Sequence, residues 1–403
     1  MKHYLGKNVL QASVDRIAWI FANFPKIYLS FSGGKDSTVM FHLAAEEARR
    51  QGRKFGVLFV DLEGQYKITI EHIEHMVEEY ADIIDLYWVS LPISLRNGVS
   101  VYQPQWECWN PDREADWVRR PSNHSITKPM EGWGCWYKRG MEFEDFVPEF
   151  GKWYADGQMC ACMVGIRTVE SLNRYRSLAR DDKQCLNGLR WTTYICDTLF
   201  NAYPIYDWKT EDIWVYHGKT KKPHNRLYDL MHKAGLSIHQ QRICQPYGDD
   251  QRKGLWLFQL IEPQTWARIV ARVNGANSGA LYAKESGNIN GVIKATLPDG
   301  HTWQSFAELL LSTMPPKAEE HYRIKISVFL KWWEREGYPK GIPDFQDRKL
   351  ETSKKVPSWR RICKTLLRND YWCKGLSFTQ HKTAAYKKYL KMKKKRGHVW
   401  KRC

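Results

Sequence analysis

Residues 32–37, which read SGGKDS, combine residue types that together can hold phosphate groups. The two glycines let the backbone come close to an anion, because they lack a Cβ and tolerate a positive φ. The hydroxyls of Ser32 and Ser37 and the ammonium of Lys35 can donate hydrogen bonds to phosphate oxygens. Asp36 is an acid among these groups, and we expect it to act through a metal ion or through the amides of the loop itself. The stretch therefore predicts a phosphate-binding loop.

Two elements must position this loop. An apolar run over 27–31 precedes it, and a helix-like segment begins near Ser37. A strand, a glycine turn and a helix N-terminus in that order aim backbone N–H groups and the positive end of the helix dipole at one place. The stretch lacks the four residues that separate the glycines of a Walker A loop. The alternative is a glycine-rich turn that binds nothing.

A second cluster of charged residues lies over 165–174. Gly165 and Arg167 precede a helix-like segment, and Glu170 and Arg174 are four residues apart on it, so the two side chains share a helix face. Two guanidinium groups near a phosphate loop can clamp an anionic nucleotide through paired hydrogen bonds. The alternative is a surface Glu–Arg pair without a ligand.

Strand-like and helix-like segments alternate over the first two hundred residues. The strand-like runs are 27–31, 55–60, 83–91, 159–166 and 201–206, and helix-like runs separate most of them. This alternation predicts an α/β fold with a doubly wound, mostly parallel sheet. Ligands of such sheets bind beyond the carboxyl ends of the strands, where the loop, Asp61 and residues 165–174 all fall. Residues 98–135 look like an irregular insertion.

The pattern becomes helical from about residue 215. We therefore predict a nucleotide-binding α/β domain over 1–215, a helical C-terminal domain over 216–351 and a basic tail segment over 352–403. The tail segment holds 17 lysines and arginines against one acid, Asp370, while the rest of the chain is nearly neutral. Such an asymmetry favours a polyanion partner, DNA or RNA, and Tyr386, Tyr389 and Trp400 could stack on bases. The alternative is a solvated basic end.

Composition narrows the class of protein. The chain has 403 residues, of which 43% are hydrophobic, and no apolar run approaches the roughly 20 residues that span a bilayer. The first residues lack the features of a secretory signal, so we expect a cytoplasmic protein with no membrane partner. Its ten cysteines are then expected to be free. Cys160 and Cys162 face one way if they lie on a strand, which leaves a metal site open.

The motif S-G-G-x-D-S resembles the PP-loop of the adenine nucleotide α-hydrolase superfamily, which includes ATP pyrophosphatases, phosphoadenosine phosphosulfate (PAPS) reductases and thiolation enzymes. The pattern G-x-R-x-x-E-S-x-x-R over 165–174 is similar to the second motif of PAPS reductase-type proteins, and residues 204–214 and 224–229 resemble further segments of that family. With 242–250 and 358–363, the chain resembles PAPS reductase-like proteins with an extra C-terminal domain, the immunoglobulin-binding regulator A type.

The resemblance implies a HUP-type fold and an enzyme that binds ATP with Mg²⁺, cleaves the α–β phosphate bond and transfers AMP to a nucleic acid or protein. It implies a ParB-like protein as a further partner. The residues that it suggests for catalysis are Lys35, Asp36, Arg167 and Arg174. Those suggested for nucleotide binding are Ser32, Gly33, Gly34, Ser37, Asp61, Gly165 and Glu170. Asp36 and Asp61 are the suggested metal contacts, and Asp61 could instead hold the ribose.

Two other functions stay open. The chain could be a nucleotide-sensing DNA-binding regulator that has lost turnover, or a PAPS reductase. Reductases of the family carry a catalytic cysteine in an E-C-G-x-H context near the C-terminus. This chain ends in Cys403, but the preceding residues, GHVWKR, do not provide that context. The departure argues against sulfonucleotide reduction.

Overall fold

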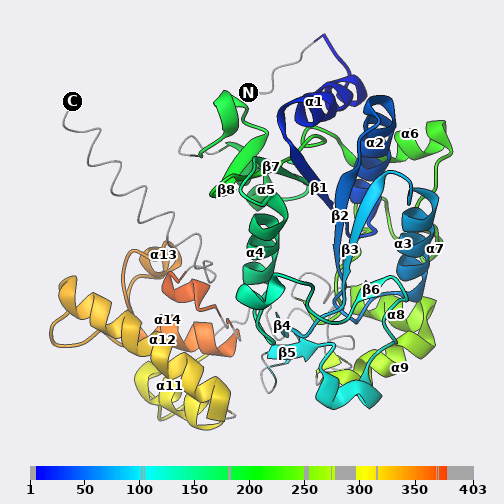
Figure 1. Cartoon of the computed structure of the whole chain (residues 1–403). Coiled ribbons are helices and arrows are strands. Elements are labelled where there is room, and N and C mark those ends of the chain that lie inside the picture. Colours follow the sequence, from blue (N-terminus) through cyan, green and yellow to red (C-terminus); the bar gives the residue numbers. More distant parts are fainter. Residues whose placement is uncertain are drawn as a thin grey trace, which may run out of the picture.

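The computed structural model describes residues 6–100, 103, 105–179, 183–248, 254–273, 275–276, 296–314, 316–368, 370 and 372–378. A seven-stranded sheet forms the centre of its first part (Figure 1). From one edge to the other, the strands are β6 (Ser125–Ile126), β3 (Ile84–Val89), β2 (Phe55–Val60), β1 (Lys26–Ser30), β7 (Cys160–Val164), β9 (Leu199–Ala202) and β8 (Thr192–Cys196). Every neighbouring pair is parallel except β8 and β9, which are antiparallel. The predicted doubly wound, mostly parallel α/β fold is confirmed.

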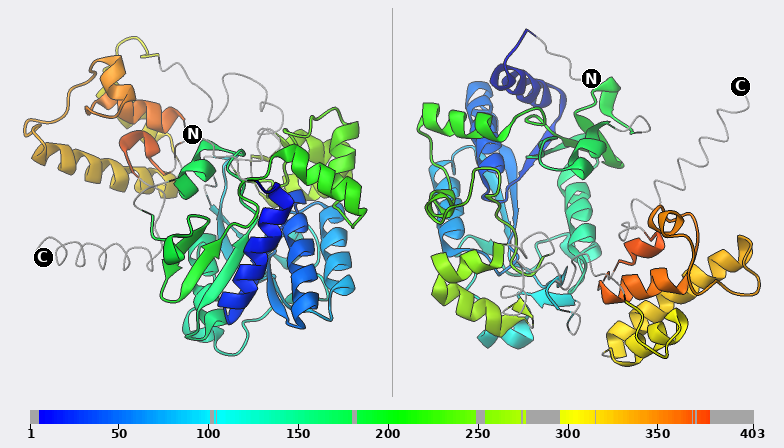
Figure 2. Two further views of the ribbon diagram at one scale, coloured as in Figure 1. Left: turned by 90° about the horizontal axis from the view of Figure 1, so that it is seen from above. Right: turned by 180° about the vertical axis from the view of Figure 1, so that it is seen from behind.

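Helices cover both faces of this sheet. Along β1, Ile27 and Leu29 belong to one buried core and Tyr28 belongs to the other, as alternation along a strand requires. The first core takes side chains from α1 (Val9–Asn23), α2 (Lys35–Gln51), α3 (Lys67–Glu79) and α6 (Thr210–Thr220). Figure 2 shows the blue helices of this group side by side over one face. The second core takes side chains from α4 (Phe143–Ala155), α7 (Leu227–Lys233), α8 (Leu255–Ile261) and α9 (Pro263–Arg272).

The segment expected to be an irregular insertion contains short regular elements. These are β5 (Gln105–Cys108), which pairs with β4 (Ile93–Arg96) just before the segment, the 3-10 helices η1 (Pro111–Asp116) and η2 (Trp133–Cys135), and β6 at the edge of the main sheet. Three of its tryptophans, Trp106, Trp109 and Trp133, are buried in the second core. After β7 come the helix α5 (Leu172–Ala179) and the 3-10 helix η3 (Leu186–Gly188).

The C-terminal helices gather around a third core, which confirms the predicted helical C-terminal region (Figures 1 and 2). They are α11 (Trp303–Ser312), α12 (Pro316–Arg335), α14 (Trp359–Leu367) and the 3-10 helix η5 (Lys374–Leu376), and the short helix α13 (Arg348–Thr352) lies between α12 and α14 in the chain. The boundaries expected after residues 215 and 351 fall inside α6 and α13. Ile362 and Leu366 of the predicted tail segment belong to the third core, whereas residues 379–403 of that segment lie outside the described residues.

Across the described residues, no helix combines the length and the apolar character that crossing a membrane requires.

Candidate functional site

The predicted phosphate loop joins β1 to α2, and the helix starts within the loop. Gly34 is the N-cap residue and Lys35 is the first helical residue. Gly33 has a φ of +67°, and a Cβ at this position would lie 2.8 Å from the side chain of Ile73, so only glycine fits. The first N–H groups of a helix have no partner within the helix itself. One of them, the Lys35 N–H, donates to the hydroxyl of Tyr228 at 3.1 Å.

Two serine hydroxyls fix the shape of the loop. The Oγ atoms of Ser32 and Ser37 are 3.0 Å apart, and the Ser37 hydroxyl also donates to the carbonyl of Gly34 at 3.0 Å. These contacts close the turn through groups of the loop itself. A loop held in this way loses less conformational entropy when it binds a ligand.

A cavity of about 220 Å³ opens at the loop. Its walls come from β1 and the loop, from the end of β7, from the start of α5 and from residues 242–244. The residues that line it are Ser30, Ser32, Gly34, Lys35, Asp36, Ser37, Val164, Gly165, Ile166, Glu170, Arg174, Tyr228, Arg242, Ile243 and Cys244.

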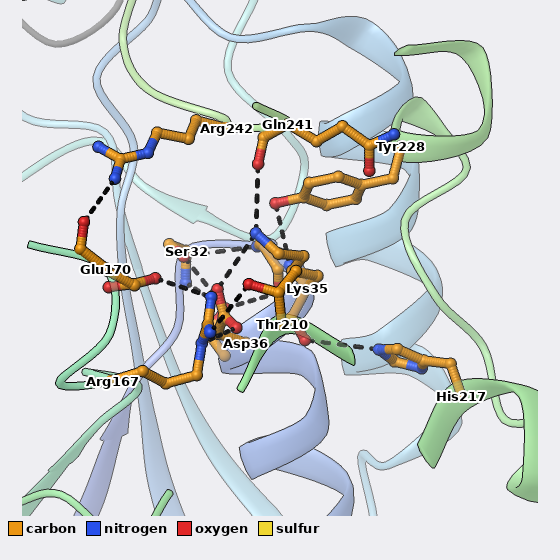
Figure 3. A network of polar contacts seen from close by, with 12 residues as sticks. Ser32, Lys35, Asp36, Arg167, Glu170, Thr210, His217, Tyr228, Gln241 and Arg242 are labelled. Carbon is orange, nitrogen blue, oxygen red and sulfur yellow. Dashed lines mark hydrogen bonds and ion pairs between the residues drawn. The ribbon is translucent and has the colours of Figure 1, made fainter. Parts of the chain in front are cut away.

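Arg167 organises the charges behind this cavity (Figure 3). Its guanidinium, only 2% exposed, donates to the carboxylate of Asp36 at 2.7 Å and to that of Glu170 at 3.3 Å. It also donates to the hydroxyl of Thr210 at 3.3 Å. One buried cation thus holds two carboxylates that come from separate segments.

Lys35 is the second buried cation of the site. Its ammonium donates to the carbonyl of Gln241 at 3.2 Å and lies 3.5 Å from the Asp36 carboxylate (Figure 3). Burial lowers the pKa of this lysine, and Asp36 opposes that shift. A buried ammonium with long contacts gains from a further anion, because desolvation has already weakened its competing interaction with water.

Two more guanidinium groups stand at the opening of the cavity. Arg174 pairs with Glu170, and its side chain is 44% exposed. Arg242 donates to the backbone carbonyl of Glu170 at 3.0 Å (Figure 3). With Lys35 inside, the cavity therefore offers cations at two depths, which suits a chain of phosphates.

Gly165 explains how the two predicted motifs meet. A Cβ at this position would lie 3.3 Å from the backbone nitrogen of Ser37 and 3.4 Å from the carbonyl carbon of Asp36. The end of β7 therefore runs directly against the first turn of α2. A side chain here would press on the backbone that forms the phosphate loop.

The structure brings most of the predicted site residues together. Ser32, Gly34, Lys35, Asp36, Ser37, Gly165, Glu170 and Arg174 line the cavity, Arg167 lies behind it and Gly33 forms the turn. Asp61 does not line the cavity. Its carboxylate is fully buried, accepts from the Trp88 indole at 2.9 Å and pairs with Arg119.

This placement bears on the predicted magnesium contacts. Asp36 lies at the cavity, but Arg167 and Lys35 already contact its carboxylate. Asp61 is engaged elsewhere. Among the residues that the structure describes, no group of three or more histidines, cysteines or acids could hold a metal ion. The residues fit a Mg²⁺ ion held by both aspartates poorly.

Sequence reasoning does not single out Tyr228, Gln241, Arg242 or Cys244 as site residues. The segments 224–229 and 242–250 carry only a resemblance to family motifs. The sequence does not show that these segments contact the phosphate loop. The Tyr228 hydroxyl, for example, accepts from the N–H of Lys35, which lies almost two hundred positions earlier in the chain.

The paired cysteines on β7 belong to the core. Cys160 and Cys162 are buried beside Tyr28. Burial raises the pKa of the Cys162 thiol to about 12 and that of Cys160 still further. Both are therefore neutral thiols at physiological pH. Cys403 lies outside the described residues.

Comparisons with known proteins place the chain in a family. Residues 26–234 match the family described as phosphoadenosine phosphosulfate reductase domain. Residues 235–341 and 340–387 match a domain of unknown function, DUF3440. The chain is similar to the uncharacterized protein YbdN of Escherichia coli K12, with 44% identity over 399 residues that cover 98% of this chain and 97% of that one.

Two solved structures show a more distant likeness. The PAPS reductase from Candida auris, in a phosphate complex, aligns with a TM-score of 0.32 and 12% identity, over 61% of this chain and 98% of that one. The U34-tRNA thiolase NcsA from Methanococcus maripaludis, solved with its [4Fe-4S] cluster, aligns with a TM-score of 0.32 and 12% identity, over 75% and 88% of the two chains.

Proposed function

Because this chain belongs to the phosphoadenosine phosphosulfate reductase domain family, we propose that it is a PP-loop enzyme that binds ATP or a related adenine nucleotide at residues 32–37 and cleaves the α–β phosphate bond. The observation that carries the proposal is the buried ammonium of Lys35 at the N-terminus of α2, beside an acid, Asp36, that Arg167 already holds. Arg174 and Arg242 add positive charge at the opening of the same cavity. This arrangement suits a ligand with several phosphates.

The proposed reaction is a transfer of AMP. An oxygen of the acceptor attacks the α-phosphorus, the bond from that phosphorus to the α–β bridging oxygen breaks, and pyrophosphate leaves with the bonding electrons. The helix N-terminus and Lys35 would stabilise the charge that develops on pyrophosphate, and Arg174 would contact the α-phosphate. Arg167 acts as a positioning residue, since its guanidinium is used to hold Asp36 and Glu170.

Magnesium enters as an expectation from the family resemblance. Mg²⁺ usually keeps several waters and binds one or two carboxylates together with substrate phosphates. Asp36 is the carboxylate that could contact such an ion, and it would have to share its charge with Arg167.

The test is incubation of the purified chain with α-labelled ATP and Mg²⁺, with and without nucleic acid. We expect labelled AMP, free or attached to an acceptor, together with pyrophosphate. An Asp36→Ala chain should give none. If ATP binds and no product forms under any condition, the protein is a nucleotide-sensing regulator and the proposed turnover is rejected.

One observation favours a second candidate, reduction of a sulfonucleotide. Cys244 lines the same cavity as Arg174 and Arg242. Its thiolate could attack the sulfur of PAPS, which would release the adenosine bisphosphate and leave a cysteine S-sulfonate. A dithiol reductant would then free sulfite and become a disulfide. This candidate predicts sulfite release that Cys244→Ser abolishes, and the absence of sulfite would exclude it.

A further inference from the structure

The C-terminal helices carry a second basic cavity, which is separate from the nucleotide site. It measures about 320 Å³ and lies between α13, α14 and η5. Five cations, Lys354, Arg361, Lys364, Arg368 and Lys374, line it together with two acids, Glu351 and Asp370. The lining is therefore net positive by three charges.

The two acids of this cavity are already used. Glu351 is 4% exposed and pairs with Arg360 at 2.9 Å and with Lys364 at 3.5 Å. Asp370 accepts from the backbone N–H of Gly375 at 2.6 Å. Arg368 and Lys374 are exposed, and among the described residues no side-chain partner neutralises either of them. The uncompensated positive charge of the cavity thus lies on its exposed rim.

Arg361 is a buried cation at the base of this cavity. It is 4% exposed and lines the cavity, and its guanidinium donates to the carbonyl of Gly375 at 2.9 Å. Its Nε is buried and has no hydrogen-bond partner among the described residues. An unpartnered buried donor is costly unless something else satisfies it, and an anion in the cavity would do so.

A second hollow adjoins the basic one, and its lining is aromatic. It measures about 530 Å³ and is lined by Val328, Phe329, Trp332, Trp333, Lys354, Lys355, Leu376, Ser377 and Phe378. Lys354 belongs to both hollows, and the guanidinium of Arg361 lies 5.4 Å from the centre of the Phe329 ring. The basic hollow, which could hold a phosphate, therefore adjoins the aromatic hollow, which could hold a base.

Trp332 is the most accessible ring of this aromatic hollow. It is 51% exposed, as is Val328 one helical turn before it on α12. Trp333 stands nearly perpendicular to Trp332, with ring centres 4.6 Å apart. An exposed tryptophan among lysines favours a ligand that has both a flat ring and negative charge.

We propose that this pair of hollows binds single-stranded nucleic acid, with a base stacked on Trp332 and neighbouring phosphates on Arg368 and Lys374. Rings for stacking beside cations for the backbone are the combination that single strands require, whereas a duplex hides its base faces. The proposal names a polymer partner for the C-terminal helices. It does not depend on nucleotide turnover at the phosphate loop, because binding is measured without ATP.

The experiment is fluorescence anisotropy of a labelled oligothymidylate with the full chain, without ATP, at several salt concentrations. We expect Trp332→Ala to weaken binding about tenfold, the range of one base stack. The double change Arg368→Ser with Lys374→Ser should lower the slope of log affinity against log salt by about 0.7 for each phosphate that the variant no longer neutralises. Phe345→Ala and Lys340→Ser, exposed residues outside both hollows, serve as controls that should change neither.

Three results would overturn the proposal. One is undiminished affinity of the Trp332→Ala chain. Another is a pair of findings: removal of residues 379–403 alone abolishes binding, and the Trp332→Ala chain and the Arg368→Ser, Lys374→Ser chain bind normally. That pair would place the binding surface beyond Phe378. The third is equal competition by duplex DNA or by oligoglutamate, which would show general attraction of polyanions.

Discussion

Arg167 and Arg174 both contact Glu170, yet replacing them should have different effects on stability. Arg167 is buried and compensates two carboxylates, whereas Arg174 is 44% exposed. Removing one partner of a buried ion pair leaves an uncompensated charge and costs roughly 3–5 kcal/mol. We expect Arg167→Ala to lower both the free energy of unfolding and the nucleotide affinity. Arg174→Ala should lower the affinity and leave the stability within about 0.5 kcal/mol.

Urea unfolding and ATP titration of the two variants check this contrast. Equal losses of stability in both would show that Arg167 has no special part in holding Asp36 and Glu170.

Glu63 shows at residue scale what the sequence could not reveal. No sequence motif singles out Glu63 as a site residue. In the structure, Glu63 is fully buried and has a φ of 65°. It pairs with Arg272 of α9 at 2.7 Å and accepts from the Trp109 N–H at 2.7 Å. The carboxylate therefore ties the α/β sheet to the segment that follows it, through an ion pair between residues more than two hundred positions apart.

At the scale of elements, three histidines lie between the helices behind the loop. His42 of α2 contacts the Tyr80 hydroxyl at 3.1 Å, His72 of α3 contacts Thr38 at 3.0 Å and His217 of α6 contacts the Lys35 carbonyl at 3.4 Å. Burial lowers the pKa of His42 and of His217 to about 4 and that of His72 to about 3. All three are neutral in the folded protein at pH 7.

Acid should therefore destabilise this group of helices. As the pH falls from about 6.5 towards 4, the histidines take up protons in the unfolded chain and not in the folded one, so the free energy of unfolding decreases. The midpoint of urea unfolding at pH 7, 6 and 5 measures the effect. His42→Gln should reduce the pH dependence, and His75→Gln, at a more exposed position, should not. An identical pH dependence in all three chains would contradict the assignment.

The contact between β7 and α2 is a second feature at this scale. Since a Cβ on Gly165 would meet the backbone of Ser37 at 3.3 Å, Gly165→Ala should displace the first turn of α2. We expect nucleotide affinity to fall several-fold. Gly218→Ala in α6 is the matched control, because nothing lies within 4 Å of its new Cβ. Titration with ATP compares the two, and an unchanged affinity for Gly165→Ala would show that the strand does not shape the loop.

Some helices and strands can be predicted from the sequence and others cannot, because only some of them carry a local signal. The sequence places β1, β2 and the start of α2 within two residues, because buried strands and amphipathic helices carry a local periodic signal. It does not reveal the β4–β5 ribbon or β8, since short edge strands are defined by their pairing partners. The loop and Arg167 are recognisable by motif, but Tyr228 and Arg242 reach the cavity through tertiary folding alone.

At the scale of the whole molecule, the basic C-terminal segment divides into two parts. Residues up to Phe378 belong to the fold, because Ile362, Cys363 and Leu366 of α14 pack against α11 in the third core. A chain that ends at Glu351 should therefore expose the apolar faces of α11 and α12. A chain that ends at Phe378 should keep them covered.

Binding of a hydrophobic dye and the thermal unfolding profile separate these two truncations. We expect strong dye binding and the loss of the unfolding transition of the C-terminal helices for the shorter chain only, while the α/β part keeps its own transition. If the chain that ends at Glu351 unfolds as the full chain does, then α14 contributes nothing to the helical core.

A second cavity competes with the phosphate loop as the place where an adenine nucleotide binds. A larger cavity of about 690 Å³, lined by Lys221, Lys222, Arg226, Lys233 and three histidines, lies beside α3 and α7. Calorimetric titration of the full chain with ATP, repeated with Lys35→Ala and with Lys233→Ala, decides between the two places. We predict an affinity at least tenfold lower for Lys35→Ala and unchanged for Lys233→Ala. Normal affinity for Lys35→Ala with abolished affinity for Lys233→Ala would show that the nucleotide binds in the larger cavity and not at the phosphate loop.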